Sequence, residues 1–305
     1  MNRNPAESMK PNYPVYVCYH ANCLDGFGAA LAAWMRFDAA AEYIPVEHGK
    51  LPSDYFDTTE QLAGSFIYIL DFSWPMDQLD ILASVAAQVI VLDHHKTFKD
   101  NTIGKLVPDN LNWVFDDSKS GAVITWEYFF PNKSVPIMLQ YIQDRDLWQW
   151  KLNGTKEVCA ALANEKITER SISYWEFLLG AYEDDDYEVI HSQFYAGKAI
   201  LATQELLIEE CMKGVTISRD SNIVLCNAPD SIASDLGNRL AEKYQCRAII
   251  FSYDGRPGKF KCSIRSIGKN PSADCTSIAR IYGGGGHYNA AGCSMTAAEM
   301  MEWLA

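Results

Sequence analysis

The sequence contains no apolar run of about 20 residues, the length that a transmembrane helix needs. Its polar start, residues 1–14, also lacks the charged-then-apolar order of a secretory signal peptide. We therefore expect a cytoplasmic protein that does not act at a membrane.

The nine cysteines are odd in number and scattered, and no Cys-x-x-Cys pair is present. This distribution lacks the usual pattern of a zinc site or a dithiol redox site, and it fits a reducing compartment. We expect most of the cysteines to be small residues of the core.

Clusters of Lys and Arg are also missing, and the formal net charge is −13. Proteins that follow a long polynucleotide usually carry a basic face that neutralises many phosphates. The charge therefore argues against a long nucleic acid as substrate. It indicates a small substrate, or one whose negative charge is neutralised locally by metal ions.

Three short apolar runs each stop at residues that can bind a metal. The runs and the residues that follow them are 15–19 before His20, 66–70 before Asp71, and 88–92 before Asp93, His94 and His95. Such runs are typical of strands buried on both faces in a parallel sheet. Because ligands bind at the carboxyl edge of open α/β sheets, we predict a metal site at this edge.

The order of predicted elements is that of a doubly wound, mainly parallel α/β sheet. A turn at 20–26 leads into an Ala-rich stretch that favours a helix, and strand and helix patterns then alternate. A long helical pattern covers about 187–212, and strand patterns dominate after it. We predict a catalytic domain over 1–195, a helical connector over 196–214 and a smaller α/β domain over 215–305.

Carboxylates and imidazoles without a thiolate suit Mn²⁺ or Mg²⁺ better than zinc, and several carboxylates at one edge suggest two ions. Two such ions activate a water and support hydrolysis of a phosphate ester or anhydride. A single structural metal is the competing interpretation, although structural sites rarely spread their ligands over so much sequence.

A run of four glycines, 283–286, precedes His287. We read this run not as a strand or helix interior but as backbone that must approach something closely. Successive backbone N–H groups there could form an anion site. His287 could contact a phosphate or protonate a leaving oxygen, and Arg265 could make a bidentate phosphate contact.

Taken together, these segments resemble the DHH/DHHA1 phosphoesterases. The resemblance extends from residue 15 to 293 and is carried by His20 with Asp25-Gly26, Asp71, Asp93-His94-His95, Asp144-Arg145-Asp146 and the Gly-Gly-Gly-Gly-His segment with Ala290-Ala291-Gly292. It implies an N-terminal DHH domain and a C-terminal DHHA1 domain with a mixed sheet. It further implies an active site in the cleft between them and two Mn²⁺ ions, with Mg²⁺ as a possible substitute.

The resemblance also implies roles for single residues. His20 would bind one metal, Asp71 would bridge both, and Asp25, His94 and either Asp144 or Asp146 would bind the other. His95 would face the substrate or orient a ligand. The phosphate or nucleotide would be held by residues of the C-terminal domain, namely Arg265, Ser266, Gly284, Gly285, Gly286, His287 and, as a weaker match, Asn238.

The first motif departs from that of many family members, which has a His and two aspartates. This chain has Asn22, Cys23 and Leu24 before Asp25. The first metal would then be bound more weakly, or be completed by water or by Asn22. For the fourth motif, the Asp-Leu-Trp context favours Asp146 over Asp144, which would then support the ligand.

The combined prediction is a Mn²⁺-dependent phosphodiesterase that hydrolyses short oligoribonucleotides or linear dinucleotides such as pGpG to mononucleotides. Alternatives on the same fold are a 3′-phosphoadenosine-5′-phosphate phosphatase, a polyphosphatase-like phosphohydrolase and a cyclic-di-AMP phosphodiesterase. A nucleotide-binding regulatory protein with a decayed metal site is the alternative outside enzymes. A homodimer formed through the DHH domain is also considered.

Overall fold

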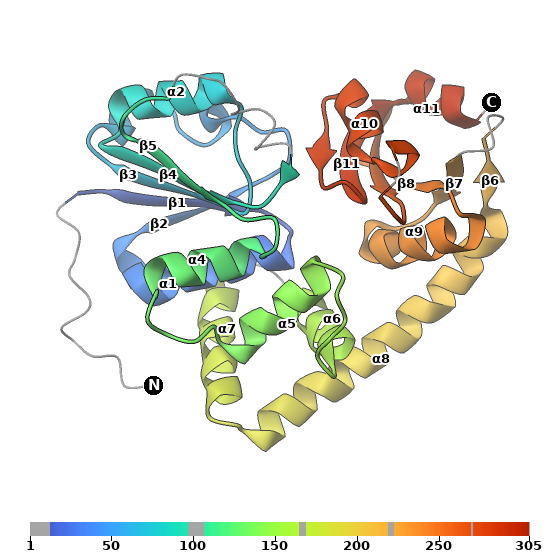
Figure 1. Ribbon diagram of the computed structural model, residues 1–305, viewed down its shortest axis with the longest axis horizontal. Helices are drawn as coiled ribbons and strands as arrows, with labels where there is room; N and C mark the ends of the chain where they lie inside the picture. Colours follow the sequence, from blue (N-terminus) through green and yellow to red (C-terminus); the bar gives the residue numbers. More distant parts are fainter. Residues whose placement is uncertain (1–12, 97–106, 165–168, 219–222, 270, 305) are drawn as a thin grey trace. The chain divides into compact units, whose positions relative to one another are not determined.

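The computed structural model describes residues 13–96, 107–164, 169–218, 223–269 and 271–304, so most of the polar start lies outside the described residues. The chain divides into two compact units, residues 1–201 and 202–305. Helix α8 (Tyr187–Cys211) contains the division point, so one continuous helix connects the units (Figure 1).

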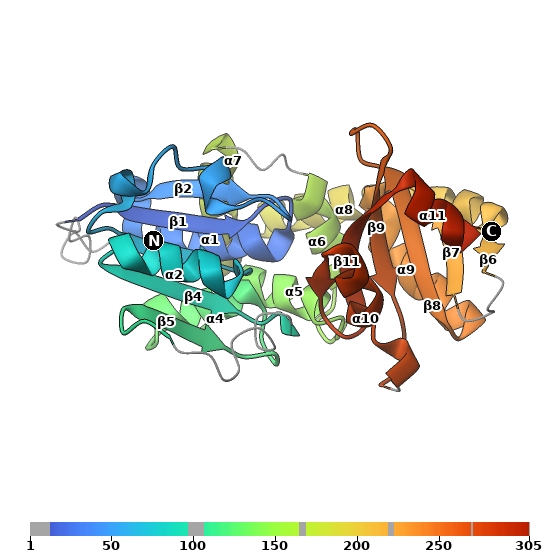
Figure 2. The same ribbon diagram turned by 90° about the horizontal axis from the view of Figure 1, so that it is seen from above.

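Five parallel strands form the sheet of the N-terminal unit, in the order β2-β1-β3-β4-β5 (Figure 2). They are β1 (Val15–His20), β2 (Glu42–Val46), β3 (Phe66–Leu70), β4 (Gln88–Asp93) and β5 (Leu111–Phe115). The chain passes from β1 to β2 on one side and then to β3 on the other. Ligands of open α/β sheets bind at the carboxyl ends beside such a switch point.

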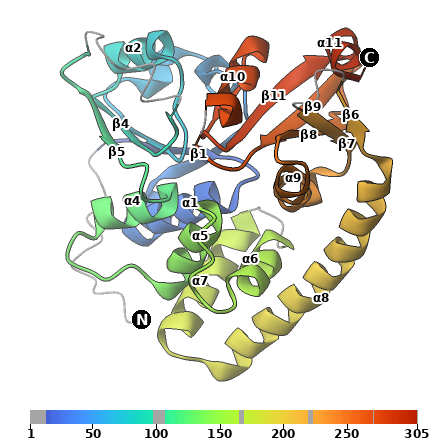
Figure 3. The same cartoon turned by 45° about the vertical axis from the view of Figure 1, so that its right-hand side comes forward.

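Helices cover both faces of this sheet, which explains why its strands are apolar on both sides (Figure 1). One face is covered by α2 (Met76–Val85) and the other by α1 (Leu24–Phe37) and α4 (Gly121–Phe129). Behind α1 and α4 lie α5 (Ile137–Asp146), α6 (Thr155–Asn164) and α7 (Glu169–Glu183) (Figure 3). Short 3-10 turns are η1 (Asp38–Ala40), η2 (Pro52–Asp54) and η3 (Thr59–Leu62).

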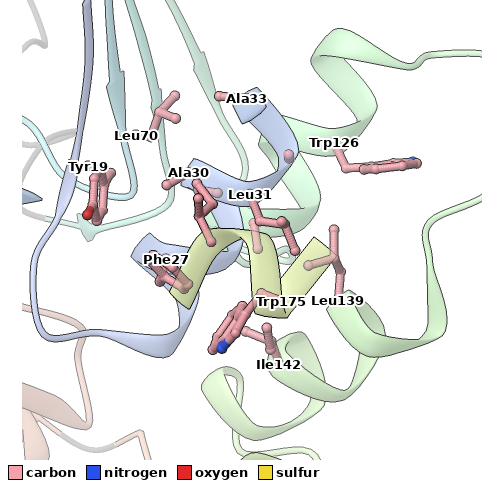
Figure 4. Packing of buried hydrophobic residues seen from close by; sticks show 14 of the residues in the cluster. Tyr19, Phe27, Ala30, Leu31, Ala33, Leu70, Trp126, Leu139, Ile142 and Trp175 are labelled. Atoms are coloured by element: carbon pink, nitrogen blue, oxygen red, sulfur yellow. The ribbon is translucent and has the colours of Figure 1, made fainter. Parts of the chain in front are cut away.

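Helix α1 is central to the larger core of this unit. Its Ala29, Ala30 and Ala33 are fully buried, and their small side chains let the helix lie close to its neighbours. Phe27 of the same helix meets Trp175 of α7 edge to face, with ring centroids 4.5 Å apart (Figure 4). Such pairs contribute about 0.5–1.5 kcal/mol beyond area burial. This packing fixes the start of α1, which carries Asp25.

Six strands form the mixed sheet of the C-terminal unit, in the order β10-β11-β9-β8-β7-β6. They are β6 (Thr216–Ile217), β7 (Ile223–Asn227), β8 (Arg247–Tyr253), β9 (Lys259–Arg265), β10 (Gly285–Gly286) and β11 (Ala290–Thr296). Only β7 and β8 pair in parallel among the described strands of this sheet.

The C-terminal sheet also has a helix layer on each face (Figure 1). One face carries α9 (Asp230–Tyr244), and the other carries α10 (Thr276–Ala279) and α11 (Ala297–Leu304). The remaining turns are η4 (Met212–Gly214), η5 (Pro271–Ala273) and η6 (Arg280–Tyr282).

The predicted fold class is confirmed, because the first unit holds a parallel sheet and the second a mixed one. Strand β5 was not among the predicted strands, and both Asp144 and Asp146 lie in the last turn of α5. None of the helices in the described ranges is long and apolar enough to cross a membrane.

Candidate metal centre and phosphate-binding loop

Three neighbouring strands of the N-terminal sheet place ligand-type residues at the same edge. His20 is the last residue of β1, Asp71 directly follows β3, and Asp93 is the last residue of β4. Because β1 pairs with β3 and β3 with β4, all in parallel, their carboxyl ends lie side by side. The structure thus brings together the three runs that the sequence singled out.

Asp71 lies at the centre of this cluster and is 1% exposed. Its Oδ1 is 3.1 Å from His94 Nε2, and its Oδ2 is 3.4 Å from His20 Nδ1. The backbone of Asp71 has a φ of 61°, a left-handed conformation that Asp tolerates better than most residues. The two oxygens of one carboxylate therefore face two different imidazoles.

Asp25 reaches the cluster from the first turn of α1. Its Oδ2 accepts a hydrogen bond from Gly121 N at 2.5 Å, and its Oδ1 accepts one from Ala122 N at 2.9 Å. These amides open α4, where orphan N–H groups and the helix dipole favour an anion. Asp25 Oδ2 also lies 3.5 Å from His94 Nε2, so the helix start aims Asp25 at the cluster.

Asp146 and Asp144, only two positions apart, have different surroundings. Asp146 Oδ2 is 3.7 Å from His94 Nε2, which brings this carboxylate to the cluster. Asp144 instead accepts hydrogen bonds from Lys151 N, Leu152 N and Thr155 Oγ1 at 2.6–3.0 Å. The oxygens of Asp144 hold the turn after α5.

Asp93 has no separate role in the sequence-based prediction, yet it organises His95. Its Oδ1 accepts hydrogen bonds from the backbone N–H groups of His94 and His95. The same oxygen is 2.7 Å from His95 Nδ1. Asp93 is fully buried, so it fixes the ring of His95 from behind. The sequence signal that could have indicated this role is the position of Asp93 directly before His94 and His95.

The groups of the cluster perturb one another strongly. Burial opposes protonation of His94, but Asp71, Asp146 and Asp25 outweigh it and raise its pKa well above the usual value. Burial would raise the pKa of Asp71, but its contacts with His20 and His94 hold it well below its ordinary value. Burial and the neighbouring carboxylates together raise the pKa of Asp25. The cluster is thus an electrostatic setting that favours a bound cation.

The donor set fits divalent metal ions. Among the described residues, the buried atoms Asp71 Oδ2, Asp146 Oδ2 and His20 Nδ1 have no hydrogen-bond partner. Buried polar atoms normally have one, so these atoms require an explanation that a metal would supply. Three overlapping groups of this unit could hold an ion, and all contain Asp71: with His20 and Cys23, with Asp25 and His94, and with Asp93 and His95.

Arg265, at the end of β9, is held in place within the C-terminal unit. Its Nη2 donates to Ser234 Oγ of α9 at 2.7 Å, and its Nη1 donates to Ile264 O at 2.9 Å. A Cβ at Gly237 would lie 2.7 Å from Arg265 Cγ, so this glycine makes room for the arginine. Asn238, on the same helix, donates to Ser234 O at 2.9 Å.

Ser266 lies inside the C-terminal unit and is 3% exposed. Its hydroxyl donates to Ala273 O at 2.5 Å and accepts from Asn289 Nδ2 at 2.9 Å. The hydroxyl thus ties two segments together, and the contact of Ser266 with a phosphate stays a prediction.

The glycine run does approach other backbone closely, as expected, and that backbone belongs to the neighbouring strand β11. Gly285 and Gly286 form strand β10, which pairs with Ala291 and Gly292 of β11. A Cβ at Gly284 would collide with Gly292 O, and one at Gly286 would lie 2.6 Å from Ala290 O. The expectation that the run contains no strand is wrong for Gly285 and Gly286, which pair with β11. The anion site stays a prediction.

His287 follows β10 in the tight turn to β11. Its N–H donates to Ala290 O at 2.7 Å, and its carbonyl accepts from Ala290 N at 3.3 Å. The glycines therefore fix the position of this histidine at the edge of the sheet.

Comparison with known proteins agrees with this architecture. The model of the DHHA1 domain matches residues 223–305. An uncharacterized protein of Acanthamoeba polyphaga mimivirus is 31% identical over 297 residues, which cover 92% of this chain and 67% of the relative. Oligoribonuclease NrnB of Bacillus subtilis (strain 168) is 23% identical over 316 residues, covering 92% of this chain and 73% of the relative.

The chain belongs to the DHH/DHHA1 phosphoesterases. Among solved structures, RecJ from Thermus thermophilus in complex with Mn²⁺ aligns with a TM-score of 0.54 and 15% identity, covering 96% of this chain and 51% of RecJ. That likeness shows the shared fold. DHH/DHHA1 phosphoesterases are metal-dependent hydrolases, so the predicted family and enzyme class are confirmed.

Proposed function

We propose that this DHH/DHHA1 phosphoesterase is a Mn²⁺-dependent phosphodiesterase that cleaves short oligoribonucleotides or linear dinucleotides, such as pGpG, to mononucleotides. The observation that carries the proposal is the position of Asp71. It belongs to each ligand group that the described residues of the N-terminal unit form, and its two oxygens approach His94 and His20 separately. A carboxylate placed in this way is suited to bridging two ions.

The chain's own residues divide into two sets around Asp71. His20 lies on the Oδ2 side, whereas His94 lies on the Oδ1 side together with Asp25 and Asp146. We assign Asp146, and not Asp144, as the ligand, because the oxygens of Asp144 already serve the turn after α5. Two bound ions would supply an activated water and would stabilise charge on the phosphate.

His95 is the residue we assign to the substrate side of the cluster. Its Nδ1 faces Asp93, so its ring orientation is fixed and its Nε2 is directed away from Asp93. A histidine held in this way can donate a proton or a hydrogen bond to a phosphate or leaving oxygen.

The C-terminal unit would bind the phosphate or nucleotide end of the substrate. We assign this contact to Arg265 and His287, which the unit holds at defined positions. Gly284, Gly285 and Gly286 shape the backbone before His287, while Ser266 and Asn238 support the fold around the contact.

Two observations favour a short substrate. The net charge of −13 and the missing Lys/Arg clusters argue against tracking a long strand. The relative from Bacillus subtilis, identical at 23% of positions, carries the name oligoribonuclease.

Product analysis tests this proposal. The full-length protein is stripped of metal, refilled with Mn²⁺ and given pGpG, other dinucleotides, longer oligomers, 3′-phosphoadenosine-5′-phosphate, cyclic dinucleotides and pyrophosphate. Fast release of mononucleotides from dinucleotides, with rates falling as the oligomer lengthens, is the expected result. Preference for long strands, or for a substrate without a phosphodiester bond, would contradict it.

An Asp71→Asn variant shows whether the cluster causes the turnover. It should lose nearly all activity and bind fewer ions, whereas Asp77→Asn, at an exposed aspartate of α2, should behave as the wild type. Turnover in Asp71→Asn near the wild-type level would assign the hydrolysis to another site.

A further inference from the structure

Cys23 occupies the turn between β1 and α1, directly beside the cluster of ligand-type side chains around Asp71. Its Sγ, a nitrogen of His20 and an oxygen of Asp71 all lie within 4.8 Å of one another. Donor atoms bound to one ion are separated by about this much or less, because each metal bond is about 2.0–2.3 Å long. The three side chains could therefore share an ion without any movement of the backbone.

The local structure fixes the position of Cys23. Ala21 N donates to Val46 O at 2.9 Å, and Asn22 has a left-handed φ of 56°. A Cβ at Gly26 would collide with His20 O, so α1 begins in close contact with the end of β1. This tight turn directs the residue before α1 toward the cluster.

Helix capping does not account for a cysteine at this position. Cys23 is the N-cap residue of α1, where Ser, Thr, Asp and Asn are favoured because their side chains accept an amide hydrogen bond. Its sulfur faces the backbone amide of Gly26 in the first turn of α1, but a thiol is a much weaker hydrogen-bond acceptor than an oxygen. Asn22, in contrast, is exposed and occupies a left-handed turn position, which Asn adopts readily.

A second observation points to a ligand at the same place. Asp71 Oδ2 faces the side of His20, is buried, and has no hydrogen-bond partner among the described residues. A buried carboxylate oxygen without a partner is costly unless a cation or donor satisfies it. Together with His20 and Cys23 it forms a set of one oxygen, one nitrogen and one sulfur donor.

We propose that the Cys23 thiolate is a ligand of the metal on the His20 side, taking the place of the aspartate that the first motif lacks before Asp25. The two metal positions are then chemically different. Sulfur favours thiophilic ions such as Zn²⁺ or Co²⁺, whereas the position formed by Asp25, His94 and Asp146 has only oxygen and nitrogen donors. This inference rests on the proposed two-metal function and adds a selective, mixed-metal centre to it.

Cobalt titration tests the assignment directly, because a thiolate bound to Co²⁺ gives an intense charge-transfer absorption in the near ultraviolet. The metal-stripped full-length protein should develop this absorption. Cys23→Ser and Cys23→Asp should lack it while still binding Co²⁺. Cys246→Ser is the matched control: it removes another partly exposed cysteine, in the C-terminal unit, and should keep the absorption.

Metal competition gives a second readout. The preference of the wild-type centre for Zn²⁺ over Mn²⁺ should fall by at least about tenfold in Cys23→Asp, which restores a carboxylate. Co²⁺ binding without thiolate absorption, or absorption that persists in Cys23→Ser, would overturn the assignment. If the Cys23 assignment failed in this way but the protein still cleaved dinucleotides with Mn²⁺, the proposed function would hold without it. A protein that bound no metal would overturn both the Cys23 assignment and the proposed function.

Discussion

The amide of Gly121 donates a hydrogen bond to the carboxylate of Asp25, and Gly121 also packs against Asp71. The donor–acceptor distance to Asp25 Oδ2 is 2.5 Å, and a Cβ at Gly121 would lie 2.6 Å from Asp71 Cβ. The start of α4 thus holds one carboxylate of the centre and makes room for another. This relationship explains why α4 must begin with a residue that has no side chain.

Gly121→Ala should therefore damage the metal centre more than the fold. The added methyl group must displace Asp71, and a misplacement of about 1 Å can lower turnover on the order of 100-fold. Gly180→Ala in α7 is the control, because a Cβ there meets nothing within 4 Å. The measurements are kcat and the melting temperature. Equal activity of the two variants would show that the contact with Asp71 is unimportant.

Substitution of Asp146 should affect metal binding, whereas substitution of Asp144 should affect the stability of the fold. Asp146→Asn is expected to weaken metal binding by at least about tenfold with little change in melting temperature. Asp144→Asn should lower the free energy of unfolding by about 1–3 kcal/mol, because an amide cannot accept all three hydrogen bonds that Asp144 receives. Calorimetry with Mn²⁺ and urea unfolding measure the two effects, and a reversed result would exchange the two roles.

The stabilising effect of Asp144 should depend on pH. Burial would raise the pKa of Asp144, but Thr155 and two backbone amides outweigh burial and lower it. A group with a lowered folded-state pKa stabilises the fold above its unfolded pKa of about 3.9 and loses this effect as the pH falls through the folded value. The difference in unfolding free energy between wild type and Asp144→Asn should thus be largest at pH 7 and shrink below about pH 4. A constant difference from pH 7 to pH 3 would contradict this linkage.

The strand-end residues of the centre could be predicted because apolar runs mark buried parallel strands. His20, Asp71 and Asp93 all lie at or directly after such runs, and parallel pairing brings them together. The role of Gly121 could not be predicted in the same way. It depends on the space beside Asp71, and no local sequence pattern reports that space.

Two other features needed the three-dimensional structure for different reasons. Asp144 and Asp146 are two positions apart on α5, and residues with this spacing face different directions on a helix. The sequence context favoured Asp146, but the hydrogen bonds that engage Asp144 in the turn after α5 come from residues 151–155, and no local pattern reports them. A glycine run is compatible with an anion site or with close packing of strands. The contact of Gly284 with Gly292 shows close packing of strands at this position, and the anion site stays a prediction.

Asp93 should act on catalysis through His95. Asp93→Asn removes the negative charge behind the ring of His95 while keeping the size of the side chain. We expect kcat to fall at least about tenfold, with the metal content of the protein unchanged. The same loss is expected for His95→Gln, and the double variant should fall little further, since the two residues act as a unit. Additive losses would show that Asp93 acts by another route.

Arg265 should affect substrate binding more than turnover. Its guanidinium is oriented by Ser234 Oγ and Ile264 O, which gives a planar donor group suited to a phosphate a defined direction. Arg265→Lys keeps the charge and loses the forked geometry, so KM for a dinucleotide should rise about 10–100-fold, the range for one hydrogen bond to a charged group, with kcat little changed. Arg239→Lys, at an arginine paired with Glu205, is the control and should leave KM unchanged. If KM for Arg265→Lys equals that of the control, the phosphate contact belongs to another residue of the C-terminal unit.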